Sequence, residues 1–494
     1  MGRASVRASR LSAFVRITKG RDLLRAVKNR RDFTTGPIFF PTLFFTIPII
    51  LSGLLQIFYN MADQVVVGQF SGDPNALAAV GSTSSITTLL ANFAIGISIG
   101  AGVVVAQHFG AARREKLSEA VHTSMALALI LGVFFALVAF FFSRPLLVLI
   151  GTQPIILDMA ALYIKIYFLG FPATMVYNFG ATILRSVGNS RLPLYILAAA
   201  GMVNVALNLV FVIAFDMSVL GVAWATTISQ YFSAVAVTVA LMRAKGDHRF
   251  FVRKLRFHRD SLGNILRIGV PSGIQGCCFA LANVIIQSAV NSLPATTLPS
   301  GEVITDVVTG RTISASIENF VYVAFHSFLQ TTLTFVGQNF GAGKQDRVKK
   351  SLFANLFWVT AVGVSVGLLL LAFFRPLCAL YIDTSLPGTE LVLAKARESG
   401  VVMLSTYFLC GIMEVLSGYL RGQGCSLTPM ISSLFGACVF RILWIELVVP
   451  IPFFHSLAGI VLSWPASWVL VIGLHLATLW IFERRKKRKS SVAL

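Results

Sequence analysis

The chain has 494 residues, of which 56% are hydrophobic and only 12% are charged, and its formal net charge is +21. One soluble core cannot hide so large a share of apolar residues, so the composition excludes a soluble globular protein and predicts a polytopic membrane protein. The high positive charge raises the question of nucleic-acid binding, which its distribution along the chain answers.

Apolar runs of about 20 residues, the length that crosses a bilayer, predict twelve membrane spans and an all-α membrane protein. The predicted spans are 38–62, 77–106, 119–142, 158–180, 192–215, 219–242, 264–292, 311–337, 350–374, 398–419, 427–450 and 456–482. Several runs exceed the minimum length, which indicates tilted or kinked helices.

The N-terminal segment, residues 1–37, is strongly basic and carries ten Lys and Arg within residues 1–31. Apolar residues are spaced through it in a way that predicts an amphipathic helix lying on the membrane surface, with an organelle transit peptide as the alternative. No cleavable signal peptide is expected, because no apolar core with a cleavage site precedes Phe39.

The basic residues are distributed asymmetrically between the two sides of the predicted spans. Of the 41 Lys and Arg, 34 lie in the termini and one set of alternate loops, five lie in the other loops, and two lie within spans. This count places Arg185 and Arg421 in the first set, Arg311 in the opposite loops, and Lys165 and Arg441 within spans. Basic loops stay in the cytoplasm, so both termini are predicted to be cytoplasmic. The charge therefore indicates topology and anionic lipid neighbours rather than nucleic acid.

An internal repeat is the strongest organisational signal. Gln107 to Ala111 (Gln-His-Phe-Gly-Ala) returns as Gln338 to Ala342 (Gln-Asn-Phe-Gly-Ala), 231 positions later. Arg185 and three following landmarks return at Arg421 and beyond, 236 positions later. Each copy holds six spans, and an even number returns the chain to its starting side, so the copies have the same orientation and are related by a pseudo-two-fold axis along the membrane normal.

The repeat divides the chain into two six-helix lobes that face each other across a cleft. The predicted divisions are a basic segment (1–37), a first lobe (38–242), a cytoplasmic linker (243–263), a second lobe (264–482) and a basic cytoplasmic tail (483–494). A cleft between similar bundles is the arrangement that alternating access requires.

Several motifs in this order resemble the multidrug and toxic compound extrusion (MATE) transporters. They are Pro48, Asn60 to Asp63, Gly81, Gly96 to Gly102, Gln107 to Gly110, Ile317 to Asn319 and Val336 to Gly343. The likeness covers about residues 38 to 482. It implies a monomeric antiporter of the cell membrane that exports organic, often cationic small molecules, driven by inward flow of protons or sodium and without a cofactor.

The resemblance also implies a cation-coupling site in the first lobe. Its residues would be Asp63, Tyr59, Asn204, Asn208 and Thr226. A carboxylate inside the membrane is costly and usually faces a cavity. A second aspartate often stands in the family where this chain has Asn208, so a hard-oxygen cage for Na⁺ at Asp63 is weakened and proton coupling is preferred. Permanent pairing of Asp63 with Lys165, or solvation at the span's mouth, is the structural alternative.

The second lobe has no aspartate that corresponds to Asp63, and its candidates for the substrate cavity or gate are Glu318, Arg441 and Glu414. Glu318 and Arg441 lie at similar predicted depths, so they either form a pair or leave Glu318 free as a counter-charge for a cationic compound. Glu414 lies near the cytoplasmic end of its span, where it can reach water.

Three function classes follow from these residues. The first is a cation-coupled exporter, the second is a flippase of lipid-linked saccharides with a similar two-lobe design, and the third is a membrane enzyme. The in-span charges (Asp63, Glu318 and Glu414 against Lys165 and Arg441) favour cationic or neutral amphiphilic cargo over a pyrophosphate head group. No nucleophile with a base, metal-ligand spacing or nucleotide-binding motif is recognised, so we expect no enzyme and no cofactor.

Overall fold

The computed structural model of the chain describes residues 32–70, 75–301, 303–383 and 387–492. The predicted surface helix in residues 1–31 lies outside the described residues. The first lobe contains α2 (Phe39–Phe70), α3 (Ala76–Gly110), α4 (Arg114–Leu149), α5 (Pro154–Leu169), α6 (Phe171–Ser186), α7 (Arg191–Asn208), the π-helical turn η1 (Leu209–Ala214) and α8 (Ser218–Met242).

The second lobe follows a linker that contains one 3₁₀ turn, η2 (Val252–Lys254). It contains α9 (Arg259–Asn291), the strands β1 (Thr296–Thr297) and β2 (Val303–Ile304), α10 (Asp306–Gly341), α11 (Gln345–Ala372), α12 (Phe374–Ala379), α13 (Thr389–Thr406), α14 (Phe408–Gly422), α15 (Leu427–Ser433), η3 (Leu434–Val439), α16 (Phe440–Leu443), η4 (Trp444–Val448), η5 (Pro452–Phe454), α17 (Leu457–Val461) and α18 (Ser463–Val492). The antiparallel β1–β2 pair lies in the loop between α9 and α10.

The twelve predicted spans are confirmed in the described part of the chain, with two of them bent. Ten helices or helical runs are long and apolar enough to cross a membrane, and α5 with α6 and α13 with α14 each form one further span, bent by 44° and 43°. The first bend falls at Gly170, and Pro172 follows it in the first turn of α6. Proline there removes an amide donor from the helix, which favours a break before it.

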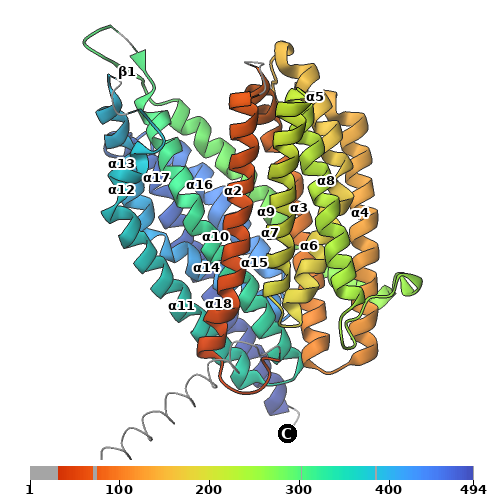
Figure 1. Ribbon diagram of the computed structural model, residues 1–494. Helices are drawn as coiled ribbons and strands as arrows, with labels where there is room; N and C mark the ends of the chain where they lie inside the picture. The colour runs from red at the N-terminus through yellow and green to blue at the C-terminus, as the bar shows by residue number, and fades with distance from the viewer. Residues whose placement is uncertain (1–31, 71–74, 302, 384–386, 493–494) are drawn as a thin grey trace, which may run out of the picture.

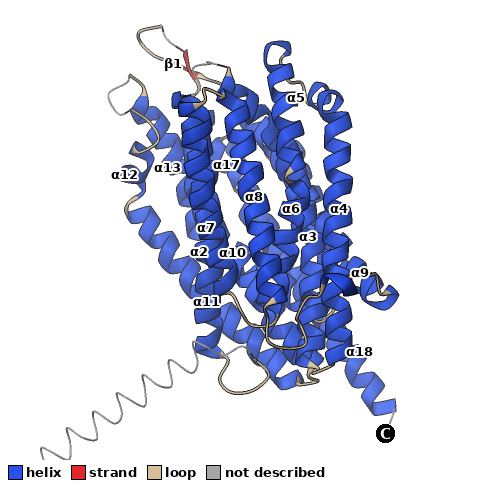
Figure 2. Ribbon diagram, turned by 45° about the vertical axis from the view of Figure 1, so that its right-hand side comes forward, coloured by secondary structure: helices blue, strands red, loops and turns tan. Residues whose placement is uncertain are grey.

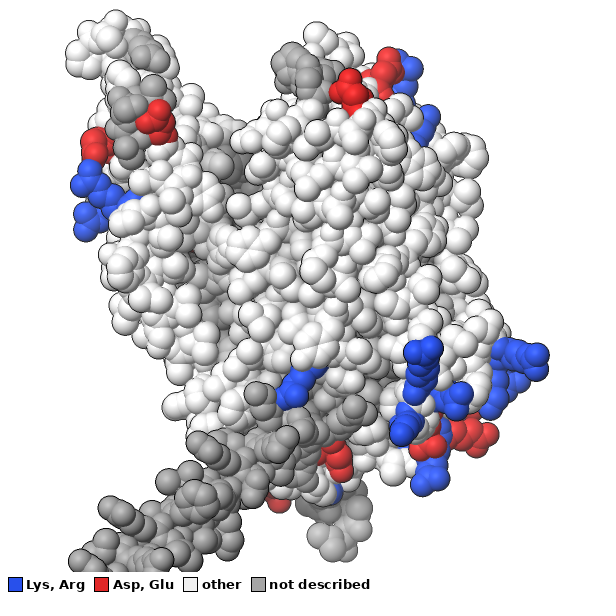
Figure 3. Space-filling view, in the orientation of Figure 1, with Lys and Arg blue, Asp and Glu red and all other residues white. Residues whose placement is uncertain are grey.

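The two lobes pack together at one end of the molecule and diverge at the other (Figure 1). The described chain begins and ends at the closed end, as the even number of spans requires (Figures 1 and 2). Figure 3 shows a notch between the lobes at the open end and a broad belt without charged residues between the two ends. An uncharged belt is the surface that lipid tails solvate.

Each lobe has its own apolar core, and α2, α3, α9 and α10 bring the two lobes into contact. The contact between α3 and α9 is close because both helices carry glycines there. A Cβ atom at Gly96 would lie 2.3 Å from the Cα atom of Gly273. Gly96 therefore allows α3 and α9 to pack closely, as small residues do at the interfaces of membrane helices.

The two copies of the repeated Gln-X-Phe-Gly motif meet at the closed end. A Cβ atom at Gly110 would lie 1.9 Å from the carbonyl oxygen of Gln338, and one at Gly341 would lie 2.0 Å from that of Gln107. Residues just before α2 cover this junction, where Phe33 stacks on Phe335 with ring centroids 4.0 Å apart. The repeat therefore forms the seal between the lobes.

Candidate coupling site and central cavity

The first-lobe site is built around the half-buried Asp63 of α2. The Nδ2 atom of Asn208, at the end of α7, donates to Asp63 Oδ1 at 2.5 Å. The hydroxyl of Thr226, on α8, donates to Asp63 Oδ2 at 3.2 Å and accepts from Asn204 Nδ2 at 3.3 Å. The structure thus brings together four of the five predicted residues, on three helices.

A local change in the helix accompanies this site. Asn208 is the last residue of α7 proper, and the π-helical turn η1 begins directly after it. Such turns inside α-helices are frequent at functional sites. Asn208 is fully buried, and no donor in the described part of the chain reaches its Oδ1 atom. The site therefore presents one carboxylate and a neighbouring amide oxygen that is still able to accept a hydrogen bond or a cation.

The two other residues considered for this site contact different groups. The hydroxyl of Tyr59 donates to the carbonyl oxygens of Leu197 and Ala198, at 3.1 and 3.3 Å, rather than to Asp63. Lys165 lies over the ring of Phe140, with Nζ 5.6 Å from the centroid. Among the ion pairs of the described residues, none joins Lys165 to Asp63. The carboxylate is accordingly surrounded by neutral donors.

A cavity of about 590 Å³ lies between the lobes, and we call it the central cavity. It is lined by α3 of the first lobe and by α9, α10, α13, α14, α16 and α18 of the second. All three predicted second-lobe residues, Glu318, Arg441 and Glu414, line it. A second cavity of about 220 Å³, the adjoining cavity, shares four lining residues with it, Ile95, Ile99, Tyr322 and His326. Asp63 lines neither of these two cavities.

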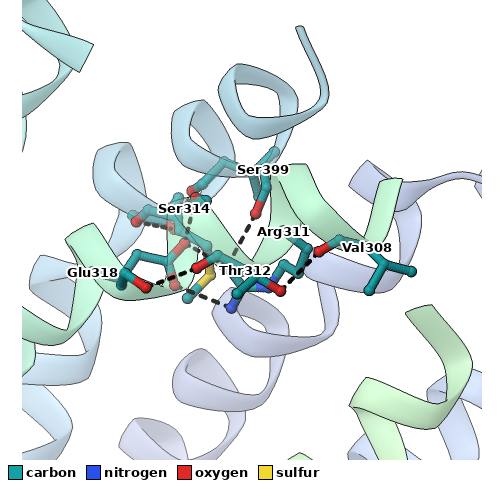
Figure 4. A network of polar contacts seen from close by, with 10 residues as sticks. Val308, Arg311, Thr312, Ser314, Glu318 and Ser399 are labelled. Carbon is teal, nitrogen blue, oxygen red and sulfur yellow. Dashed lines mark hydrogen bonds and ion pairs between the residues drawn. The ribbon is translucent and has the colours of Figure 1, made fainter. Parts of the chain in front are cut away.

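Glu318 forms an ion pair with Arg311, not with Arg441 (Figure 4). The guanidinium of Arg311 donates to both carboxylate oxygens, at 2.6 and 3.1 Å, and also to Ser399 Oγ at 3.1 Å. Ser314 Oγ donates to Glu318 Oε1 at 2.7 Å. The predicted placement of Arg311 in an outward loop was wrong, because α10 begins at Asp306 and its second turn buries the arginine.

Arg441 instead donates from Nε to Ser467 Oγ at 2.8 Å. The guanidinium carbons of Arg311 and Arg441 lie 5.0 and 5.6 Å from the ring centroid of Trp464. Aromatic faces attract guanidinium groups through the ring quadrupole, so Trp464 holds both arginines at the cavity wall.

Two further arginines that the sequence placed in cytoplasmic loops line the cavities, and that placement was also wrong. Arg421, near the end of α14, lines the central cavity and donates to Gln275 Oε1. Arg185, near the end of α6, lines the adjoining cavity and donates to Gln330 Oε1 at 2.5 Å. The sequence offered one sign that they share a role, because Arg185 and Arg421 occupy corresponding positions in the two copies of the repeat. Both fall at the end of an apolar run, where a hydropathy pattern does not distinguish a buried helix terminus from a loop.

Glu414 was expected to reach water near the end of its span, but only 7% of its surface is exposed. No hydrogen bond or ion pair joins its carboxylate to another residue within the described ranges. In those ranges, no three His, Cys, Asp or Glu side chains come together as metal ligands.

The sequence model of the MatE family matches residues 48–210 and 271–445, one stretch in each lobe. The chain belongs to the MATE family. It is therefore a multi-pass membrane transporter of a family that exports small compounds, and not an enzyme. Its two-lobe architecture of twelve spans is that of MATE structures.

Relatives and solved structures agree with this assignment along nearly the whole chain. The probable multidrug resistance protein YoeA of Bacillus subtilis is 26% identical over 437 residues, which cover 86% of this chain and 90% of that protein. A MATE structure in complex with MaD3S has a TM-score of 0.82 at 19% identity, covering 92% of this chain and 98% of that one. A transporter of the MOP superfamily from Pyrococcus furiosus, described as having a binding pocket of reverse polarity, has a TM-score of 0.79 at 20% identity, covering 94% and 98%.

Proposed function

We propose that this MATE transporter exports organic compounds through the central cavity in exchange for protons that bind at Asp63. The observation that carries the proposal is the environment of this carboxylate, which lies in a membrane span and is hydrogen-bonded by the neutral groups of Asn208 and Thr226. A carboxylate fixed by an ion pair keeps its charge, whereas one held by neutral donors can gain and lose a proton.

Coupling would pass through helices, because Asp63 does not line the cavities described above. Its hydrogen bonds join α2 to α7 and α8 on one side. On its other side α2 contacts the second lobe, where the hydroxyls of Thr46 and Thr331 are 2.8 Å apart. Protonation of Asp63 removes an acceptor for Asn208 or Thr226 and changes the packing of α2, which is positioned to alter the angle between the lobes.

Sodium is the alternative coupling ion. The oxygens of Asp63, Asn208 and Thr226 lie close together and are hard ligands, but only one of these groups carries a negative charge. Sites that strip water from a hard cation usually supply more anionic oxygens. We therefore favour the proton.

The asymmetric distribution of basic residues supports a location in the cell membrane with both termini in the cytoplasm. In that orientation the closed end of the molecule faces the cytoplasm and the notch faces outward. We propose that the transporter acts as a monomer with the lipid bilayer as its surroundings.

The cargo follows from the cavity. The charges counted within the predicted spans favoured cationic or neutral amphiphiles. That count left out Arg185, Arg311 and Arg421, which line the cavities. Arginines facing the cavity are also the observation that favours the second candidate function, a flippase that carries the phosphate of a lipid-linked saccharide.

The test is transport in proteoliposomes under a proton gradient alone and then under a sodium gradient alone, with a panel of fluorescent dyes as cargo. We expect the proton gradient to suffice. Transport driven only by sodium would show that sodium, and not the proton, is the coupling ion. The absence of any gradient-driven transport would overturn the antiport proposal.

A further inference from the structure

We infer that the central cavity binds the anionic head group of an organic compound, phosphate or carboxylate, next to an aromatic or apolar body. This rests on the proposed function only in taking the central cavity as the transport route, and it departs from the cationic cargo that the sequence suggested.

The first argument is the balance of charges. Four arginines (Arg185, Arg311, Arg421 and Arg441) and two glutamates (Glu318 and Glu414) line the central and adjoining cavities. The three arginines and two glutamates of the central cavity are between 3% and 7% exposed. Charges so far from bulk water are stable only when they are paired or hydrogen-bonded.

The second argument is how these charges are paired. Arg311 and Glu318 neutralise each other through two hydrogen bonds. The hydrogen bonds of Arg185, Arg421 and Arg441 go to the neutral groups of Gln330, Gln275 and Ser467. Glu414 is the one lining carboxylate outside the pair. Outside the pair, the walls of the two cavities therefore hold three guanidinium groups against one carboxylate, and the positive charge is in excess.

The third argument is unused donors. The Nε atoms of Arg185 and Arg421 are buried and have no hydrogen-bond partner within the described residues. A guanidinium carries five N–H donors in a planar fork, which matches two oxygens of a phosphate or carboxylate. The protein itself therefore does not fully satisfy either guanidinium, and an anion in the central cavity would supply the missing negative charge beside Arg421 and Arg441.

The remaining lining suits an aromatic body. Trp464 lies under Arg311 and Arg441, and Tyr407 stacks on Trp468 with centroids 5.2 Å apart at 29°. All three aromatic residues line the central cavity. Ligand sites combine such apolar walls with a few polar groups that fix orientation.

The test uses three probes with one ring system and different head groups: naphthyl phosphate, naphthol and naphthylmethylammonium. Binding is measured on the purified full-length protein in nanodiscs of phosphatidylcholine. We expect the phosphate to bind at least about tenfold more tightly than the other two. Tighter binding of the ammonium compound would overturn the inference.

Variants locate the site. Arg421→Gln and Arg441→Gln are each expected to weaken phosphate binding by about tenfold, and Arg421→Lys by less because it keeps the charge but not the fork. Glu414→Gln removes the opposing carboxylate and is expected to tighten binding, which a misfolded protein could not show. Lys165→Gln, which removes a cation from the first lobe outside both cavities, is expected to leave binding unchanged. Unaltered binding in both arginine variants, or weaker binding in Glu414→Gln, would overturn the assignment.

A second arm distinguishes the source of the anion. Nanodiscs that contain polyprenyl phosphate are titrated with naphthyl phosphate. Competition assigns the site to a lipid head group, and its absence assigns it to an organic anion from the aqueous phase; both results support an anion site. Failure of proton-driven export with intact anion binding would count against the proposed antiport alone.

Discussion

Gln107 of the first lobe and Gln338 of the second make the same hydrogen bond in opposite directions across the boundary between the lobes. Gln107 Nε2 donates to the carbonyl oxygen of Gly422 at 2.9 Å, and Gln338 Nε2 donates to that of Ser186 at 2.8 Å. Ser186 and Gly422 are themselves 236 positions apart, the offset of this part of the repeat. The pseudo-two-fold axis therefore passes through the seal at the closed end.

We expect the double variant Gln107→Ala and Gln338→Ala to open this end. Each side chain contributes roughly 1 kcal/mol through its hydrogen bond, and removal of both shifts the equilibrium between conformations by more than tenfold. Spin labels at Arg114→Cys and Lys350→Cys, exposed residues at the closed end of the two lobes, report the separation in a background without the native cysteines. A longer distance should become populated. Gln69→Ala, an exposed glutamine at the other end of α2, is the control, and an unchanged distance distribution in the double variant would contradict the seal.

Asp63→Asn should abolish proton-driven export while the protein still folds. Asparagine keeps the shape of the side chain and one acceptor oxygen for Asn208, and its amide nitrogen can donate to the hydroxyl of Thr226, but it cannot exchange a proton. Efflux under a proton gradient is measured beside size-exclusion chromatography of the purified variant. Asp158→Asn is a matched control, because the Asp158 side chain is 80% exposed and pairs with Arg144 at the surface. Undiminished efflux in Asp63→Asn would remove this residue from the coupling mechanism.

Glu318→Gln should lower the stability of the protein strongly. It leaves the guanidinium of Arg311 buried without its partner, which costs about 3–5 kcal/mol. The measurement is thermal unfolding in detergent. Glu390→Gln breaks an exposed pair with Arg375, in which the side chains are 75% and 73% exposed, and should cost less than about 1 kcal/mol.

The double variant Arg311→Met and Glu318→Leu tests whether the loss of stability comes from leaving one buried charge without its partner. It removes both buried charges and should recover most of the stability lost in Glu318→Gln. An equal loss of stability in the single and the double variants would show that the pair is not what the protein depends on at this position.

Gly96→Ala should hinder the approach of α3 and α9. The added Cβ would lie 2.3 Å from the Cα atom of Gly273, and backbone atoms cannot move aside as a flexible side chain can. Overpacking of this kind costs about 1–3 kcal/mol, which thermal unfolding can detect. Gly81→Ala lies on the same helix with open space around the new methyl group and serves as the control. Equal unfolding temperatures in the two variants would contradict the close contact.

Much of the fold could be predicted because the bilayer imposes a simple rule on apolar length. The repeat offsets also predicted the two lobes and their symmetry. The residues around Asp63 were implied by the resemblance to the MATE family. The spacing of Asn204 and Asn208 agrees with that assignment, because residues four apart share one helix face. Tyr59 follows the same spacing rule relative to Asp63, yet its hydroxyl reaches the backbone of α7 instead.

The charges of the cavity were harder to predict. A buried arginine at the end of an apolar run, such as Arg185 or Arg421, has the same local sequence as a cytoplasmic anchor. The pair between Arg311 and Glu318 was within reach, because residues seven apart stand two helical turns apart on one face. The predicted span began only at residue 311, and the count of basic residues assigned Arg311 to the loop before it, so the pair was not recognised.

The separation of Asp63 from the arginine-lined cavity has an electrical consequence. A cycle that takes up one proton at Asp63 and releases one singly charged anion from the cavity moves two elementary charges in the same inward sense. A membrane potential that is negative inside then contributes about 4.6 kcal/mol per cycle for each 100 mV, twice the value for a single charge. Voltage alone, without any pH difference, would be enough to drive such a transporter.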